Sequence, residues 1–155
     1  MKKELLSNEL YKLIRPVADG LDMTVVEVQK QFPGPSETKV VITVMKNDGA
    51  TGIDDLEKFH RSVQSILELV IGRDNLSMEV GTPGLERNIK DAEEFAFFKN
   101  RAVRIYSTEK KDWVSGIITD TDEEGVVLDS GEKILFSNVH KAKLDYRWDV
   151  PASRR

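Results

Sequence analysis

The chain has 155 residues, a formal net charge of −4 and no cysteine. The lack of cysteine excludes disulfides, thiolate chemistry and Cys-based zinc sites, and it fits a reducing compartment. Residues 1–90 contain 12 basic and 14 acidic side chains, and residues 91–155 contain 11 and 13, so neither half is a basic nucleic-acid module by composition. The acidic balance favours a basic protein partner at least as much as a nucleic acid. The start, MKKELLSNELYKLI, has no unbroken apolar run. We therefore expect a cytoplasmic protein without a signal peptide or membrane helix.

The first half predicts an α+β domain over residues 1–90. A helical stripe is formed by Leu6, Leu10, Leu13, Ile14 and Val17. The β-branched segments 23–29 and 39–45 flank a proline- and glycine-rich turn at 32–36, which predicts a hairpin. Thr51 with Asp54 is expected to cap a long helix from Ile53 to Val70. Alternation over Leu76–Val80 predicts a third strand. The expected fold is two helices on one face of a three-stranded sheet.

The second half, residues 91–155, predicts a small all-β barrel of the SH3 or Sm type, entered through a short helix at Asp91–Asn100. The expected strands are short and separated by turn signals; they cover residues 103–106, 113–119, 125–128, 133–136 and 139–144. Gly116 lies inside the second of them, where such a barrel needs a sharp bend.

No catalytic or metal-binding constellation is recognisable. His60 and His140 are isolated, and no HExxH, Walker-type or nucleophile-elbow motif occurs. The acidic run at 120–124 lacks the alternating ligand spacing of a calcium loop, which favours a solvated hairpin tip. We therefore expect no enzyme activity, no metal and no cofactor. A hydrolase that uses the acidic turns is the least supported alternative.

Two stretches are candidates for binding. In MEVGTPGLERNI (78–89), the pair Pro83-Gly84 suits a type II turn with Gly84 at positive φ, which would place Leu85, Glu86 and Arg87 at a domain edge. A turn whose Glu and Arg pair locally is the alternative. The run from His140 to Arg155 has five basic and two acidic residues with Tyr146 and Trp148 between them. Its candidate contacts are Lys141, Lys143 and Arg147, by charge and stacking on RNA. A plain barrel strand followed by a tail is the alternative.

The segment Glu79–Arg87, EVGTPGLER, is similar to the sequence E-V-S-S-P-G-L-D-R-P-L that joins the two domains of the RimP (YhbC-like) family of bacterial ribosome maturation factors. Three further stretches resemble family motifs: Gly20-Leu21-Asp22, Gly52–Leu56, and Phe95 and Phe98 followed by Val103–Ile105. The resemblance runs from about Leu5 to Leu144. Gly81 and Thr82 replace two serines, Glu86 replaces Asp, and Asn88-Ile89 replaces Pro-Leu. We expect these departures to affect the angle between the domains more than the role.

The resemblance implies a non-enzymatic, monomeric assembly factor that binds the free, immature small (30S) ribosomal subunit. Its partners would be the decoding-region ribosomal protein of that subunit and 16S rRNA. We expect the PGLER turn to set one domain against the other and to present Arg87 at their junction. The main rival is a free-standing Sm-like RNA-binding protein, to which 114–118 bears a faint similarity.

Overall fold

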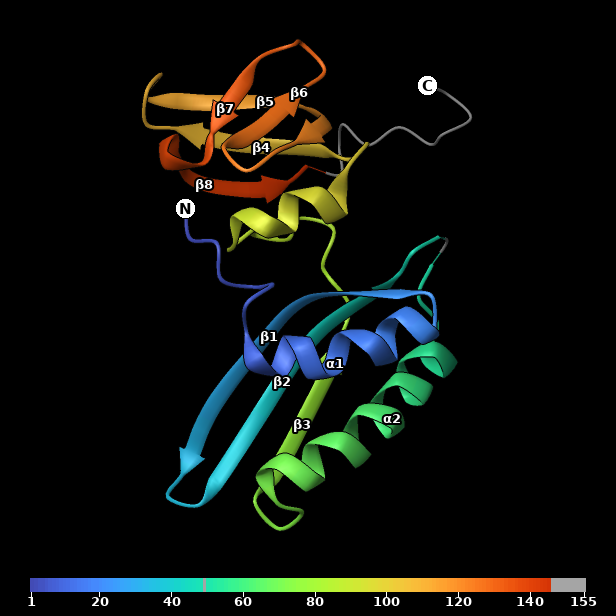
Figure 1. Cartoon of the computed structure of the whole chain (residues 1–155). Helices are drawn as coiled ribbons and strands as arrows, with labels where there is room; N and C mark the ends of the chain where they lie inside the picture. Colours follow the sequence, from blue (N-terminus) through green and yellow to red (C-terminus); the bar gives the residue numbers. More distant parts are fainter. Residues whose placement is uncertain (49, 146–155) are drawn as a thin grey trace. The chain divides into compact units, whose positions relative to one another are not determined.

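The computed structural model describes residues 1–48 and 50–145, and the chain divides into two compact units (Figure 1). The N-terminal unit comprises Leu5–Pro83. The barrel unit comprises Met1–Glu4 together with the chain from Gly84 onward. The chain therefore passes from one unit to the other twice.

In its described part, the N-terminal unit is an α+β sandwich, as predicted. Its elements are α1 (Glu9–Gly20), β1 (Met23–Gly34), β2 (Glu37–Lys46), α2 (Ile53–Ile71) and β3 (Leu76–Gly81). The sheet order is β1-β2-β3, with β1 antiparallel and β3 parallel to β2. The parallel pair requires a crossover, and α2 supplies it. Both helices lie on one face of the sheet (Figure 1).

The core of this unit forms where the alternating apolar residues of the sheet meet the helical stripes. Val25, Val40, Ile42 and Val44 are buried from the sheet, and Ile14, Phe59, Val63 and Leu67 are buried from the helices. At about 1.5–3 kcal/mol for each large apolar side chain, this burial is what holds the helices to the sheet.

Two local predictions in this unit need correction. The cap of α2 is Gly52 and not Thr51: the Gly52 N–H donates to Asp55 at 2.9 Å, while the Thr51 hydroxyl accepts from the Lys46 N–H at 3.0 Å. Thr51 thus closes the loop before the helix. Strand β1 continues to Gly34, and the pairing register shifts between Gln31 and Gly34, so the turn is shorter than the sequence suggested. Proline is tolerated there because β1 is an edge strand.

The barrel unit contains, in its described part, the strands β4 (Ala102–Ser107), β5 (Asp112–Thr121), β6 (Gly125–Leu128), β7 (Lys133–Leu135) and β8 (Val139–Leu144). They form one antiparallel sheet in the order β7-β6-β5-β4-β8. A short 3-10 turn, η2 (Phe136–Asn138), leads into β8, which returns beside β4. Five short antiparallel strands agree with the small all-β domain that the sequence predicts.

Two glycines let the barrel strands approach closely. The first half of β5 pairs with β4 and the second half with β6, and Gly116 lies near the change, with Leu128 and Asp129 where a Cβ would point. At Gly125, a Cβ would lie 2.4 Å from the backbone oxygen of Ile134. Both glycines therefore allow a close approach of the neighbouring chain, and the sharp bend predicted at Gly116 stays a prediction.

The compact units differ from the predicted domains 1–90 and 91–155 at both ends of the N-terminal unit. The first residues lie with the barrel because the Met1 ammonium donates to Phe136 O at 3.0 Å and Ala92 N donates to Lys2 O at 2.8 Å. Residues 87–89 lie there because they pair with β8: Ile89 N donates to Ala142 O at 2.8 Å and Leu144 N donates to Arg87 O at 2.9 Å. The entry helix is the 3-10 helix η1 (Ala92–Phe98).

Candidate functional site

The turn of the PGLER stretch lies two residues later than predicted. Arg87 N donates to Gly84 O at 3.2 Å, so Leu85 and Glu86 occupy the middle of the turn. The φ of Gly84 is not positive, and a type II turn centred on Pro83-Gly84 is therefore wrong. Pairing of the next residues with β8 decides this geometry. Leu85 remains 66% exposed at the tip.

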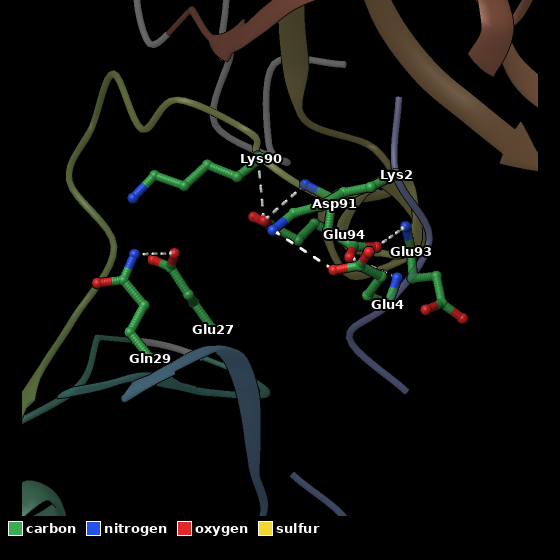
Figure 2. Close-up of polar contacts among 8 residues, drawn as sticks. All are labelled: Lys2, Glu4, Glu27, Gln29, Lys90, Asp91, Glu93 and Glu94. Carbon is green, nitrogen blue, oxygen red and sulfur yellow. Dashed lines mark hydrogen bonds and ion pairs between the residues drawn. The ribbon is translucent and has the colours of Figure 1, made fainter. Parts of the chain in front are cut away.

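The Arg87 side chain points into the barrel unit and not toward solvent. Its Nε donates to Glu94 Oε1 at 2.8 Å, and the two side chains are 8% and 1% exposed. The other oxygen of Glu94 accepts from the N–H groups of Lys90 and Asp91 at 3.1 and 3.2 Å (Figure 2). A buried carboxylate with several donors and a guanidinium partner fixes the path of the linker into η1. Arg87 thus holds the turn in place.

Asp91 continues this polar network toward the first residues of the chain. Its carboxylate accepts from Glu93 N at 2.9 Å, which caps η1, and from Glu4 N at 2.7 Å (Figure 2). Lys3 adds a bond to the Glu123 carbonyl and lies 5.5 Å from the centroid of the Phe136 ring. The residues before Leu5 are thus fastened to the barrel unit at several points.

The structure brings together three of the predicted site residues. Glu86 lies 3.8 Å from Lys143, measured from carboxylate oxygen to Nζ, and Lys141 lies on the same strand two residues before Lys143. Pro83 belongs to the N-terminal unit and Gly84 begins the turn. Arg147 lies outside the described residues, as do Tyr146 and Trp148. Glu86 and Arg87 do not pair with each other, as the alternative proposed, because Glu86 pairs with Lys143 and Arg87 with Glu94.

Lys141 and Lys143 belong to a surface that the sequence did not reveal as one site. We call it the basic-aromatic face; it consists of Arg104, Tyr106, Trp113, His140, Lys141 and Lys143 on the outside of β5-β4-β8. The strand register builds it: Tyr106 lies between Trp113 and Lys141, and Arg104 lies between Ser115 and Lys143. Residues opposite each other on neighbouring strands project from the same side of a sheet.

The aromatic side chains of this face contact one another. The Tyr106 ring lies edge-on to Trp113, with centroids 5.6 Å apart, and edge-on to His140 at 5.9 Å. The Arg104 guanidinium lies over the Trp113 ring, 5.4 Å from its centroid. Such a cation–π contact orients both groups. Trp113 is still 42% exposed, so part of the indole remains accessible.

A hollow of about 220 Å³ opens between the cations of this face and is lined by Asn88, Arg104, Trp113, Lys141, Ala142 and Lys143. Arg104 Nε lies 3.5 Å from the buried Asp145 carboxylate but forms no hydrogen bond within the described chain. Lys143 forms an ion pair with Glu86, whereas Lys141 forms no ion pair with any residue in 1–48 or 50–145. The hollow is therefore lined by three cationic side chains and the indole of Trp113.

The remaining candidates offer no chemistry in the described residues. Within 1–48 and 50–145, no group of three or more His, Asp or Glu side chains could hold a metal ion, and no helix is long and apolar enough to cross a membrane. The acidic turn is a hairpin: Asp122 accepts from the N–H of Glu124 and Gly125 at 2.7 and 3.0 Å. Its bond to Lys133 and these N–H groups lower the pKa of Asp122 to about 2. This carboxylate stays ionised and serves the turn.

The N-terminal unit also has an apolar groove, between α2 and the edge strand β3. Ile53, Leu56, His60 and Val80 line it, together with the ion-paired residues Glu57 and Arg61. Ile53 is 82% exposed. His60, expected to be isolated, forms part of this groove wall and has no second imidazole or carboxylate arranged as a metal site in the described chain.

Comparison with known proteins decides the family. Residues 13–86 match the model of the RimP N-terminal domain. A protein of Borrelia turicatae named ribosome maturation factor RimP is 32% identical over 147 residues, which span 93% of this chain and 99% of that protein. The chain belongs to the RimP family. A RimP of Borrelia recurrentis is also 32% identical, over 89% of this chain and 95% of its own length. The similarity to these RimP proteins therefore includes both compact units.

Sequence reasoning missed Arg104, Tyr106 and Trp113 as parts of a site. Their strands were predicted correctly, and a period of two along each strand would have put Arg104 with Tyr106 and Lys141 with Lys143 on one side. What the sequence did not supply was the barrel's strand order and inside face. The RimP-family motif directed attention instead to the PGLER turn, whose Arg87 is buried in the structure.

Proposed function

We propose that this protein is a non-enzymatic, cytoplasmic maturation factor that binds the free, immature small ribosomal subunit. The observation that carries the proposal is similarity over nearly the full length of proteins named ribosome maturation factor RimP. A match of one domain alone would have supported only a shared fold. We further propose that it acts as a monomer, without metal or cofactor.

The mechanism is a shift in population and requires no covalent step. A factor that binds one arrangement of rRNA and ribosomal protein more tightly than another enriches the first by the difference in affinity. About 1.4 kcal/mol of differential binding changes the ratio of the two arrangements tenfold. The acidic charge of the whole chain favours approach to basic ribosomal proteins, among which we propose the one at the decoding region.

For the contact residues, we propose Leu85, Glu86, Lys141, Lys143 and Arg147. The turn tip at Leu85 and Glu86 is exposed, and the ion pair between Glu86 and Lys143 joins the tip to β8. Pro83, Gly84 and Arg87 are proposed to act on binding indirectly. Pro83 and Gly84 begin the turn, and Arg87 holds it through Glu94.

Sedimentation through sucrose gradients tests the proposal. The purified chain is mixed with free small subunits and, separately, with assembled ribosomes. We expect it to migrate with the free subunits only. Equal migration with assembled ribosomes, or none with either at low and moderate salt, would refute the function. A Leu85→Ser variant removes exposed apolar surface without touching the Arg87–Glu94 pair, and we expect it to bind the subunit more weakly while keeping its thermal stability.

A further inference from the structure

We propose that the basic-aromatic face binds single-stranded RNA. A base would stack in the hollow against the planar groups of Trp113 and Arg104, and the backbone phosphates would lie along Lys141 and Lys143. The inference rests on the proposed function for the source of the RNA, which would be the small subunit's own rRNA. The binding chemistry is argued from the face alone.

The arrangement of the face suits a nucleobase. Both Trp113 and Arg104 line the hollow, and aromatic rings and guanidinium planes are the two side-chain groups on which splayed RNA bases stack. The cation–π contact at 5.4 Å and the edge contact from Tyr106 hold the indole in one orientation, so little order has to be gained on binding. Asn88, on the opposite wall, offers an amide that could bond to a base edge.

The charge of the face separates it from the rest of the chain. The protein has a formal charge of −4, which repels nucleic acid overall. On the face, two of the three cations have carboxylate neighbours, Asp145 for Arg104 and Glu86 for Lys143, and Lys141 has none in the described chain. A basic ribosomal protein would be repelled by this patch, whereas phosphates would be attracted.

Single strands are favoured over duplex for two physical reasons. Stacking on Trp113 and Arg104 requires an unpaired base that can separate from its neighbouring bases, and the paired bases of a duplex cannot do so. In addition, a flat sheet with few cations makes few phosphate contacts, so stacking must supply much of the affinity. The expected binding is therefore only moderately dependent on salt.

Fluorescence anisotropy with a labelled 12-nucleotide uridine RNA tests the face in the full chain. With up to three cations and about −0.7 for each phosphate on a single strand, log K should fall with log salt at a slope of about −1 to −2. Trp113→Ala should weaken binding about 5- to 150-fold, the loss expected for one stacked base. Trp113→Phe keeps a stacking ring and should bind nearly as well as the original chain. Lys141→Ala should reduce the steepness of the slope by about 0.7.

Two substitutions in the N-terminal unit serve as matched controls. Phe32 is 69% exposed, against 42% for Trp113, so Phe32→Ala removes an aromatic ring that is at least as accessible from another surface. Lys58 is an exposed lysine of α2, and Lys58→Ala removes one charge as Lys141→Ala does. Neither control should change affinity or slope. Thermal melts of each variant distinguish lost stacking from lost folding, and Trp113→Phe with Lys141→Ala keep the proposal testable if Trp113→Ala unfolds.

Several results would overturn the proposal. These are equal binding of RNA by Trp113→Ala, equal binding of duplex and single-stranded RNA, or no binding at low salt. A Trp113→Ala variant that loses a purified basic ribosomal protein but binds RNA as before would assign the face to protein instead. Failure of the proposed function is a separate outcome: RNA binding that depends on Trp113, with no migration with free small subunits, would keep the face and refute the ribosomal role.

Discussion

The buried ion pair between Arg87 and Glu94 gives the sharpest prediction about stability. In Arg87→Met, the aliphatic part of the side chain is kept and the guanidinium is lost, so the buried Glu94 carboxylate loses the Arg87 guanidinium. Removing one partner of a buried pair costs about 3–5 kcal/mol. Glu94 keeps two backbone donors, from Lys90 and Asp91, which places the expected loss near about 3 kcal/mol.

A loss of this size is large for a unit of this length. At about 4–8 °C for each kcal/mol in a small domain, Arg87→Met should lower the melting temperature of the barrel unit by roughly 12–24 °C. Tryptophan fluorescence follows this unit selectively, because Trp113 belongs to it and residues 1–83 contain no tryptophan. The double variant Arg87→Met with Glu94→Gln removes the buried charge and should recover much of the loss.

The matched control is an exposed pair in the same unit. Lys110 lies 2.6 Å from Glu132, with side chains 50% and 31% exposed. Lys110→Met should cost under about 1 kcal/mol, as surface pairs do. The control should therefore melt less than about 4–8 °C below the original chain, and if Arg87→Met shifts no further than the control does, the argument from burial is wrong. Such a result would return Arg87 to the group of contact residues.

Three further effects follow from single contacts. Gly125→Ala should destabilise the barrel unit by more than about 1 kcal/mol, because the new Cβ would lie 2.4 Å from a backbone oxygen of β7. Gly84→Ala, whose Cβ would have nothing within 4 Å, should change the urea midpoint of this unit little. The pKa of Asp122 is lowered to about 2 in the folded chain, so its bond to Lys133 stabilises the fold at neutral pH. This contribution is lost as the pH falls from about 4 through about 2. In Asp122→Asn, that part of the acid sensitivity should be absent from unfolding curves. Asn8 caps α1 by accepting from a backbone N–H at 3.0 Å, so Asn8→Ala should cost about 1 kcal/mol in the N-terminal unit, measured by circular dichroism.

Periodicity was enough to place the secondary structure of both units. The long helix from Ile53 and the alternating strands have patterns with periods near 3.6 and 2, which burial of one face enforces. The ends of elements were less accurate because they depend on single hydrogen bonds. Whether Thr51 or Gly52 caps α2 is decided by the Thr51 bond to Lys46, which sequence spacing does not show.

Long-range pairing explains the larger differences. Residues 87–89 pair with β8, which lies about fifty residues later in the chain. The first four residues form hydrogen bonds with groups as distant along the chain as Asp91 and Phe136. No local propensity encodes such partners. The type II turn predicted at Pro83-Gly84 is wrong for the same reason: the residues after it are fixed by pairing with β8, and the turn moves to Gly84–Arg87.

The segment Pro83–Ile89 is distinctive as a sequence because several of its side chains have specific structural partners. Arg87 needs a guanidinium to reach Glu94, Glu86 needs a carboxylate beside Lys143, and Ile89 is 4% exposed in the barrel core. Such requirements restrict residue type strongly. A face that stacks a base and attracts phosphate needs only a ring and several cations on the correct side of a sheet, and many sequences meet that condition. Substitution of Arg87 should therefore report first on stability, and substitutions at Trp113 and Lys141 should report on binding.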